Sequence, residues 1–462
     1  MFRPLIQWRG LVAASAVATW SLLAVVACGD SNERVTFDED AGTDAGGANL
    51  PDTPSSPETD GGSGSSFDAS AEPVVCEVSP CVVELAAGTN HLCALLSTGE
   101  VSCWGENSFG AVGNGTPEPN AGTGGGKDKG DPGPDEQVLE DITRPARVTD
   151  LSNVTQISAA YRTTCARRSD GAVLCWGGNE WGQLGLSASG GEADWFPHSY
   201  RNEVELGTSA IRVDVGQQTA CALLASGELS CWGANYMKQL ARPEEDGILG
   251  PGTSDRAGFV VKRTAGSDTS SYGVTEGGGL LSWGELAARE GSLNPDAVPA
   301  QVPTLSNVHD VAAGPTHACA IAGGRVYCWG SSQVYALCTG LPSTERLPAH
   351  AILQTTAFPQ QLAVSTNNTC VRLTDGSIQC CGAGSLGQLA ITPDGGLDAM
   401  MSFTRAENFK GHAVQVVTTG ITTCALLRSG AVECWGGNKH GELGQGTRDK
   451  GAHPEPVVVS FQ

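Results

Sequence analysis

The sequence predicts an all-β fold, a seven-bladed β-propeller of four-stranded blades with disulfide-stapled hairpins, and three observations support this. One unit recurs seven times with a mean period of about 55 residues, which accommodates a small four-stranded sheet with its loops. Six of the seven units carry two cysteines about ten residues apart. The 62 glycines and 24 prolines lie between apolar runs, as turns between short strands require.

Each unit combines strand patterns with a Trp-Gly pair. In the first unit the stretches 83–88, 92–96 and 100–104 alternate roughly between apolar and polar residues and predict strands. The first cysteine or its substitute recurs at positions 93, 165, 221, 271, 319, 370 and 424. If the two cysteines of a unit face each other, Ser97-Thr98-Gly99 forms a three-residue turn and Gly323-Gly324 a two-residue turn. The same register leaves Thr275 to Gly278 as the turn of the fourth unit.

The paired cysteines predict disulfides. The expected hairpin pairs are Cys93 with Cys103, Cys165 with Cys175, Cys221 with Cys231, Cys319 with Cys328, Cys370 with Cys380 and Cys424 with Cys434. In the fourth unit serine stands at both positions, Ser271 and Ser282, and such paired loss favours disulfides over free thiols, which stay the alternative. Zinc is disfavoured because short Cys-x-x-Cys or His-containing spacings are missing. Cys76 and Cys81 are close enough to bridge each other, and a bridge between Cys338 and Cys381 stays open.

The N-terminal residues predict export. Arg3 and Arg9 precede an apolar stretch, 11–26, so residues 1–27 are expected to be a signal peptide. The run Val25-Val26-Ala27-Cys28 resembles the bacterial lipobox, which implies lipidation of Cys28, with an incidental cysteine as the alternative. Residues 28–71 are too polar to fold and predict an acidic tether, and residues 72–462 form the propeller. We therefore expect a lipid-anchored protein of the cell envelope, periplasmic or surface-exposed.

Charge and motifs narrow the function classes. The formal charge of −23 would repel nucleic acid, which is an unlikely kind of partner. The eight histidines are scattered, and the sequence contains neither a His-Glu-x-x-His nor a Gly-x-Ser-x-Gly motif. We expect no catalytic residue, no metal site and no cofactor.

The run after each second cysteine resembles a known repeat. Trp104 to Gly110, Trp176 to Gly185 and Trp435 to Gly444 are similar to the regulator of chromosome condensation repeat, over residues 82–462. The resemblance implies a seven-bladed propeller, although the fourth unit and the run from Cys381 depart from the pattern. The eukaryotic founder of that family is a guanine-nucleotide exchange factor and nucleosome binder. Charge and export argue against both roles here, whereas a secreted bacterial relative that inhibits a β-lactamase suggests binding through one propeller face.

Two groups of residues are candidates for partner contact. An insertion expected after blade two concentrates Trp195, Phe196, Tyr200 and Arg201, the residue types that anchor interfaces. A ring on one rim is the second group, and its members are Phe109, Trp181, Met237, Val334, Leu386 and His440. The alternatives are folding of the insertion onto its own propeller and packing of the rim between blades. The tryptophans of the Trp-Gly pairs are expected to be packing residues.

The favoured hypothesis is a monomeric, non-enzymatic scaffold that binds a protein or a glycan through loops on one face. An enzyme with a loop-built site in the central channel is the first alternative, and a guanine-nucleotide exchange-type regulator of a small GTPase, by family analogy, is the second. Glu72 to Val75 and Glu455 to Val459 are both candidates for the strand that closes the ring.

Overall fold

The computed structural model describes residues 72–115, 139–186, 193–243, 245–285, 288–292, 295–332, 334–340, 344–391 and 399–461. The expected signal peptide 1–27, the lipidation site Cys28 and the tether 28–71 lie outside these residues. Within the described ranges the regular structure consists of strands, and no helix there has the length and apolar character needed to cross a bilayer.

Seven antiparallel four-stranded sheets follow one another along the chain, each made of four consecutive strands. The strands are, for blade 1, β1 (Val82–Ala87), β2 (His91–Leu96), β3 (Val101–Gly105) and β4 (Ile142–Arg147); for blade 2, β5 (Val154–Ala160), β6 (Thr163–Arg168), β7 (Val173–Asn179) and β8 (Asp194–Glu203); for blade 3, β9 (Ala210–Val215), β10 (Thr219–Leu224), β11 (Leu229–Ala234) and β12 (Ile248–Thr253); for blade 4, β13 (Val261–Gly266), β14 (Ser270–Thr275), β15 (Leu280–Gly284) and β16 (Asp296–Gln301); for blade 5, β17 (Val308–Ala313), β18 (His317–Ala322), β19 (Arg325–Ser331) and β20 (Thr344–Ala351); for blade 6, β21 (Pro359–Val364), β22 (Asn368–Leu373), β23 (Ile378–Ala383) and β24 (Ala399–Arg405); and for blade 7, β25 (Ala413–Thr418), β26 (Thr422–Leu427), β27 (Val432–Gly436) and β28 (His453–Val458).

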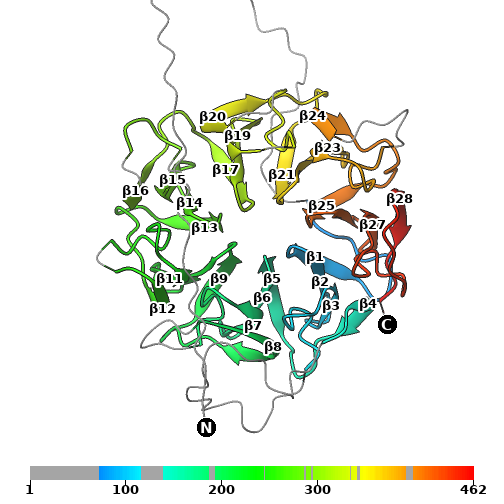
Figure 1. Ribbon diagram of the computed structural model, residues 1–462, viewed down its shortest axis with the longest axis horizontal. Coiled ribbons are helices and arrows are strands. Elements are labelled where there is room, and N and C mark those ends of the chain that lie inside the picture. Colours follow the sequence, from blue (N-terminus) through cyan, green and yellow to red (C-terminus); the bar gives the residue numbers. More distant parts are fainter. Residues whose placement is uncertain are drawn as a thin grey trace, which may run out of the picture. The chain divides into compact units, whose positions relative to one another are not determined.

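The sheets stand radially around one axis, with β1, β5, β9, β13, β17, β21 and β25 nearest the centre (Figure 1). The predicted seven-bladed propeller is therefore confirmed. No described strand is exchanged between the first and last blades, because residues 455–458 belong to β28 and pair within blade 7. Glu72 to Val75 joins no sheet as a strand.

Strand direction assigns every connection to one of two faces. On one face, which we call the loop face, the first strand of each blade ends and the second begins, and the third strand ends and the fourth begins; in blade 1 this face holds residues 88–90, 106–115 and 139–141. The second turn and the connection to the next blade lie on the opposite face, the hairpin face; in blade 1 these are residues 97–100 and 148–153.

The inner strands are joined by polar side chains at their third position. In each inner strand the pairing register skips the second residue, and such a bulge re-aims the side chain that follows it. The third residues are Glu84, Gln156, Arg212, Arg263, Asp310, Gln361 and Gln415. All seven are long or charged, in strands that are otherwise mostly apolar.

Five of these side chains bond to the backbone of the next blade, and the other two junctions use Asp214 and the pair of Arg263 with Asp310. Gln415 accepts a hydrogen bond from the amide N of Leu85 at 2.8 Å and donates one to its carbonyl at 2.9 Å, which joins blade 7 to blade 1. Gln156 and Gln361 make the same pair of bonds to Val213 and Val416. The remaining junctions use carboxylates: Glu84 accepts from the amide of Ile157, Asp214 from Thr264, Asp310 from Leu362, and Arg263 pairs with Asp310 between blades 4 and 5.

The six hairpin disulfides predicted from the sequence are confirmed. Each joins two directly opposed residues of the second and third strands of a blade, with a Cα–Cα distance of 4.1 Å, close to the spacing of a non-hydrogen-bonded pair. The bonded pairs are Cys93 with Cys103, Cys165 with Cys175, Cys221 with Cys231, Cys319 with Cys328, Cys370 with Cys380 and Cys424 with Cys434. Before the first blade, Cys76 and Cys81 are likewise bonded.

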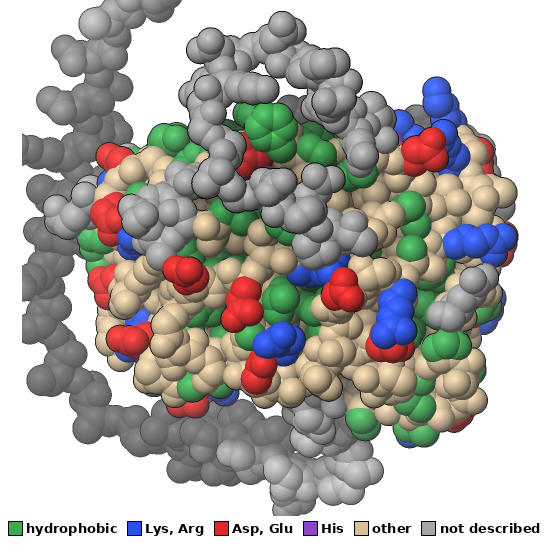
Figure 2. Space-filling view, turned by 90° about the horizontal axis from the view of Figure 1, so that it is seen from below, with side chains coloured by type: hydrophobic (Ala, Val, Ile, Leu, Met, Phe, Trp, Pro, Cys, Tyr) green, Lys and Arg blue, Asp and Glu red, His purple; other side chains and the backbone are tan. Residues whose placement is uncertain are grey.

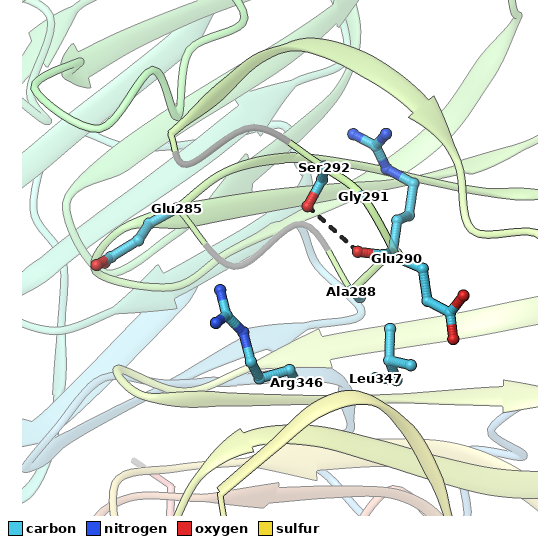
Figure 3. Close-up of a pocket in the computed structure, with 8 residues that line it drawn as sticks. Glu285, Ala288, Glu290, Gly291, Ser292, Arg346 and Leu347 are labelled. Atoms are coloured by element: carbon cyan, nitrogen blue, oxygen red, sulfur yellow. Dashed lines mark hydrogen bonds between the residues drawn. The ribbon is translucent and has the colours of Figure 1, made fainter.

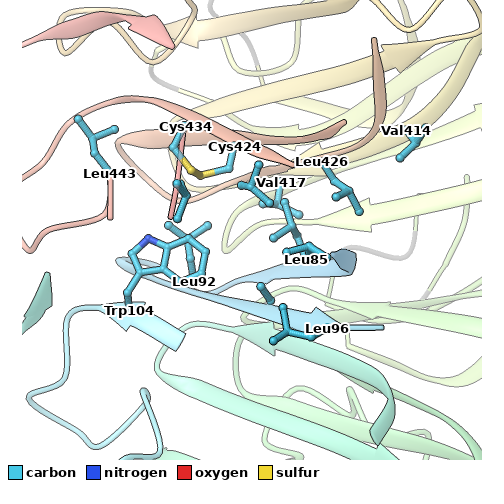
Figure 4. Packing of buried hydrophobic residues seen from close by; sticks show 14 residues of the cluster. Leu85, Leu92, Leu96, Trp104, Val414, Val417, Cys424, Leu426, Cys434 and Leu443 are labelled. Carbon is cyan, nitrogen blue, oxygen red and sulfur yellow. A yellow bond between two sulfur atoms is a disulfide. The ribbon is translucent and has the colours of Figure 1, made fainter. Parts of the chain in front are cut away.

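Further from the axis, each of these disulfides packs toward the neighbouring blade. At the junction of the last and first blades, Cys424 and Cys434 share a buried cluster with Trp104, the tryptophan of the Trp-Gly pair, and with Leu92 (Figure 4). The disulfide of one blade and the indole of the next therefore form the apolar part of the interface.

The indole N–H of the tryptophan adds a bond across the same interface. Trp104 donates to the carbonyl of Glu442 at 2.8 Å, and Trp176 donates to the carbonyl of Ala111 at 2.9 Å. Trp232, Trp283 and Trp435 donate in the same way to Gln183, Gln239 and Gln388 of the preceding blade. The expectation that these tryptophans are packing residues agrees with their burial, since their exposure is 0–1%.

The interface between blades 5 and 6 replaces the indole with a covalent bond. Cys381 occupies the tryptophan position of blade 6, and Cys338 occupies the position at which Gly113, Gly185 and Gly444 lie against an indole ring. Cys338 and Cys381 form a disulfide, the pairing that the sequence left open. The departure from the repeat pattern at Cys381 is therefore a paired substitution across one interface.

The fourth hairpin corrects one sequence expectation. Tyr272, not Ser271, pairs with Ser282, so the cysteine positions of blade 4 hold tyrosine and serine and the turn has the ordinary length. The hydroxyl of Ser282 instead accepts a hydrogen bond from Arg289, which is paired with Asp296 at 2.7 Å. In the first and fifth hairpins the turns are as expected: Gly99 has a φ of 81°, and Gly323 and Gly324 have φ of 54° and 74°.

The residues before blade 1 fasten the two ends of the ring on the hairpin face. The amide of Val75 donates to the carbonyl of Arg428 at 2.7 Å, and the amide of Glu77 donates to that of Ser429 at 2.9 Å, both in the blade 7 hairpin turn. The Glu72 carboxylate lies 2.8 Å from His412 and 3.6 Å from Arg428. The chain therefore enters the propeller on the face opposite the loop face.

Replacing Glu84 with glutamine tests the inner ring. Burial raises the pKa of Glu84 from 4.5 to about 7. The unfolded chain therefore loses this proton at a lower pH than the folded protein does. As a result, the contribution of Glu84 to the free energy of unfolding falls as the pH rises from about 4.5 to about 7. Glutamine would make both bonds that Gln156 and Gln415 make. We expect Glu84→Gln to raise the free energy of unfolding by about 2 kcal/mol at neutral pH and to leave it nearly unchanged below about pH 4.

Urea denaturation across this pH range measures the effect. The exposed Glu205→Gln removes one carboxylate without touching the ring and serves as the control. A Glu84→Gln variant that is less stable than the parent at neutral pH would show that the carboxylate itself is needed at this junction.

Candidate functional site

An asparagine and a glutamine or glutamate recur in the loops that follow the Trp-Gly pairs, and their hydrogen bonds to the backbone stabilise these loops. The Oδ1 atoms of Asn107, Asn179, Asn235 and Asn438 each accept a hydrogen bond from the amide five residues later. The Oε atoms of Gln183, Gln239, Gln388 and Glu442 each accept one from the amide two residues earlier. The repeat motif therefore builds the loop and positions the carbonyl that receives the next tryptophan; it is not itself a ligand site.

The same backbone geometry requires glycine in each Trp-Gly pair. At Gly177 the φ is 109°, and an added Cβ would lie 2.2 Å from the carbonyl oxygen of Arg162. The same close approach of backbone occurs at the equivalent glycine of all seven blades, including Gly382 after Cys381.

The aromatic segment expected in an insertion after blade two lies in a strand instead. Residues 194–203 form β8, the outer strand of blade 2, because Gly177 pairs with His198 and Cys175 with Asn202. Trp195 and Phe196 stand at its loop-face end and are 68% and 67% exposed, the two most exposed large apolar side chains among the described residues.

The other two residues of that segment are differently placed. Arg201 has a side chain that is only 4% exposed and donates to the carbonyl of Gly115 at 2.9 Å, with Asp150 3.4 Å away. Tyr200 is half-buried, with its ring edge-on to His198. Arg201 therefore ties the blade 1 loop to β8, whereas Trp195 and Phe196 face solvent.

Phe109 lies beside a pair of residues that the sequence did not single out. The guanidinium of Arg162 lies 3.9 Å from the centre of the Phe109 ring and 4.9 Å from that of Tyr161, and Nη1 of Arg162 is 2.7 Å from Oε1 of the buried Glu180. Tyr161 has a φ of 50°, an uncommon conformation for a bulky residue. Both residues belong to the turn between β5 and β6, which carries no motif.

The rest of the rim is heterogeneous. His440 is 3.0 Å from Asp141, Met237 is 38% exposed, and Trp181, Val334 and Leu386 are partly buried or lie at the edge of the described ranges. The backbone at this position also serves packing, because the carbonyls of Phe109 and Leu386 accept hydrogen bonds from His198 and His453 of the next blade.

Four aromatic residues lie on the loop face at the junction of blades 1 and 2. Tyr161 lines a small cavity near the axis, Phe109 shares the guanidinium of Arg162 with it, and Trp195 and Phe196 are exposed on β8, whose His198 donates its amide to the carbonyl of Phe109. We call Phe109, Tyr161, Trp195 and Phe196 the aromatic stripe. It joins part of each predicted contact group, since one member comes from the rim and two from the segment 195–201.

The cavities of the described residues are small or mixed in charge. One cavity of about 20 Å³, roughly the space of one water, lies on the loop face among the first turns of blades 1, 2, 3, 6 and 7, where the amide of Thr89 bonds to the carbonyl of Tyr161. A second cavity of about 350 Å³ is lined by Glu285, by residues 288–292 of blade 4 and by β20, with Arg346 pointing into it (Figure 3). Arg289, at its edge, is already bound to Asp296.

Among the described residues no group of three or more His, Cys, Asp or Glu side chains is placed to hold a metal. On the side shown in Figure 2, acidic and basic side chains alternate among uncharged ones, without a continuous basic surface.

A family model matches three of the units described above. It is the regulator of chromosome condensation (RCC1) repeat, and it matches residues 82–111, 154–183 and 210–239, which are the first three strands and the following turn of blades 1, 2 and 3. These three segments match the RCC1 repeat. The matched units share their hydrogen-bonded loop with blade 7, so the repeat extends structurally beyond the three matches.

The proteins to which this chain is similar include two of Arabidopsis thaliana. The ultraviolet-B receptor UVR8 is 25% identical over 79% of this chain and 79% of its own length. The mitochondrial RCC1 domain-containing protein RUG3 is 27% identical over 57% of each chain, so this chain spans little more than half of that relative. The structure of Prp20p from Saccharomyces cerevisiae superposes with a TM-score of 0.63 at 16% identity, covering 84% of this chain and 88% of Prp20p, and shows a shared fold.

Arg201 and Trp195 should separate structural from surface roles within β8. We expect Arg201→Ala to lower the free energy of unfolding by about 1–3 kcal/mol, because it leaves buried carbonyls without a donor. Trp195→Ala should change it by less than about 0.5 kcal/mol, since the side chain is exposed. Guanidinium denaturation of both variants measures the difference, and equal losses would contradict the placement of the two side chains.

Proposed function

We propose that this protein is an exported, lipid-anchored binding protein that recognises a protein partner through the aromatic stripe on its loop face. The observation that carries the proposal is the exposure of Trp195 and Phe196 on β8, a strand whose backbone is bonded to Phe109, with Arg162 stacked on the Phe109 ring. Exposed aromatic and arginine side chains on one face are typical of protein interfaces.

The two faces of the propeller support this orientation. The chain enters at Glu72 on the hairpin face, where Arg428 and His412 hold its carboxylate. The proposed tether would therefore join the propeller at the hairpin face, opposite the face that carries the aromatic stripe. The eight disulfides support an oxidising compartment, in which such bonds persist.

The two alternatives have less support. A catalytic site in the central channel would need a group of converging catalytic side chains, and the cavity that the first turns line there holds mainly Gly, Ala, Thr, Ser and Val with Tyr161 and Gln217. Prp20p has binding properties to Gsp1p and histones, but the identity of 16% supports only a shared fold here. The net charge of −23 also disfavours a nucleosome as partner.

Affinity capture from cell-envelope extracts, with crosslinking, tests the partner site. We expect Trp195→Ala and Phe109→Ala each to reduce the captured partner by about tenfold, the loss of one interface anchor. The exposed Val298→Ala on β16 should leave capture unchanged. The melting temperature of all three variants is the folding control. Undiminished capture by both stripe variants would remove the stripe as the contact surface.

Mass spectrometry of the mature N-terminus tests the anchor. We expect the protein to begin at an acylated Cys28 and to partition into detergent, and Cys28→Ser to move it to the aqueous phase, because lipid attachment supplies the membrane affinity. A mature chain that retains residues 1–27, or one that begins elsewhere without lipid, would contradict the proposed anchor.

A further inference from the structure

The carboxylates beside the aromatic stripe outnumber the cationic side chains. Glu106, Glu180 and Asp194 lie around it, whereas Arg162 is the guanidinium that stacks on its rings. The charge of Arg162 is balanced by Glu180, at 2.7 Å. The stripe therefore carries a net negative charge, in keeping with the charge of the whole chain.

Glu106 is bonded by neutral donors alone. Its carboxylate accepts hydrogen bonds from Asn90 at 2.7 Å and from the hydroxyl of Ser108 at 2.8 Å, and no lysine, arginine or histidine of the described residues lies within ion-pair distance of it. Burial alone would raise the pKa of Glu106, but these hydrogen bonds, with the nearby charges of His440 and Arg162, hold it below its usual value. Within the described part of the chain, Glu106 is thus an ionised group that forms no ion pair.

The rings of the stripe are already a surface on which a guanidinium rests. Arg162 lies over Phe109 and beside Tyr161 at distances typical of cation–π contacts. Aromatic faces next to an ionised carboxylate provide both interactions that a lysine or arginine side chain makes in an interface. An acidic segment would find the guanidinium of Arg162 already paired.

We propose that the partner presents a basic segment, with arginine or lysine next to an apolar residue, and that its cation binds between Glu106 and the aromatic stripe. The proposal rests on the proposed function and specifies the chemistry of the partner. The apolar residue would pack on Trp195 or Phe196, which stand exposed at the outer end of the stripe.

Synthetic peptides test this chemistry without knowledge of the natural partner. The probes are three capped tetrapeptides that alternate tryptophan with arginine, with glutamine or with glutamate, titrated into the intact protein by calorimetry. We expect the arginine peptide to bind about fivefold more tightly than the glutamine peptide, and the glutamate peptide to bind most weakly. The affinity for the arginine peptide should fall between about 50 mM and about 300 mM NaCl, because salt screens the charge.

Two charge-matched variants locate the site. Glu106→Gln should weaken binding of the arginine peptide by about fivefold, whereas Glu205→Gln, which removes the same charge from an exposed position on the hairpin face, should have an effect of less than about twofold. Phe109→Ala should weaken binding of both the arginine and the glutamine peptide. Melting temperatures exclude unfolding as the cause.

The outcomes separate the two proposals. If partner capture depends on Trp195 and Phe109 but the three peptides bind alike, or Glu106→Gln and Glu205→Gln act alike, the partner is not selected by its cation and this inference fails while the proposed function stands. If Phe109→Ala and Trp195→Ala change neither capture nor peptide binding, the stripe is not the contact surface and both proposals fail.

Discussion

The ring depends on polar side chains of the inner strands that bond to the next blade, and at five of the seven junctions the third residue of the strand bonds to the backbone of its neighbour. Many closed sheets hold their ends together by exchanging a strand, but the described blades of this chain are each continuous in sequence. The junction between the last and first blades is therefore made by the same element as the others, the amide of Gln415 on the backbone of Leu85. A side chain with both a donor and an acceptor suits this position because it satisfies two backbone groups at once.

In the outer part of the interface between two blades, the side chains of one blade match those of the next in size and polarity. A disulfide presents a compact apolar surface, the indole ring covers it, and the indole N–H finds the carbonyl of the preceding loop. Between blades 5 and 6 both partners change together, with Cys381 in place of the indole and Cys338 in place of glycine. In blade 4 the changes are also joined, since Tyr272 packs edge-on against Trp329 where a disulfide would lie.

The sequence predicted the architecture because cysteine, tryptophan and glycine each recur for a physical reason that leaves little choice of residue. It misplaced the fourth hairpin by one position because both cysteines are missing there and Ser271 imitated the pattern. The exposed aromatics of β8 were found by composition, which could not reveal that Arg201 is buried. The sequence analysis missed Tyr161 and Arg162. An alignment of the first turns would have shown that Tyr161 stands where blade 1 has Thr89 and blade 3 has Gln217.

Each blade is formed by one continuous segment of the sequence, and this determines where the chain could be cleaved or circularly permuted. Because no strand is shared between the described blades, a break in any of the connections on the hairpin face leaves seven complete sheets, and the natural termini could be joined to give a permuted chain. A single cleavage between Ala351 and Pro359 would be a special case, because Cys338 and Cys381 would still hold the two fragments together covalently. Such a nicked protein would come apart only after reduction, which makes this junction the natural place to divide the propeller into two pieces and reassemble it.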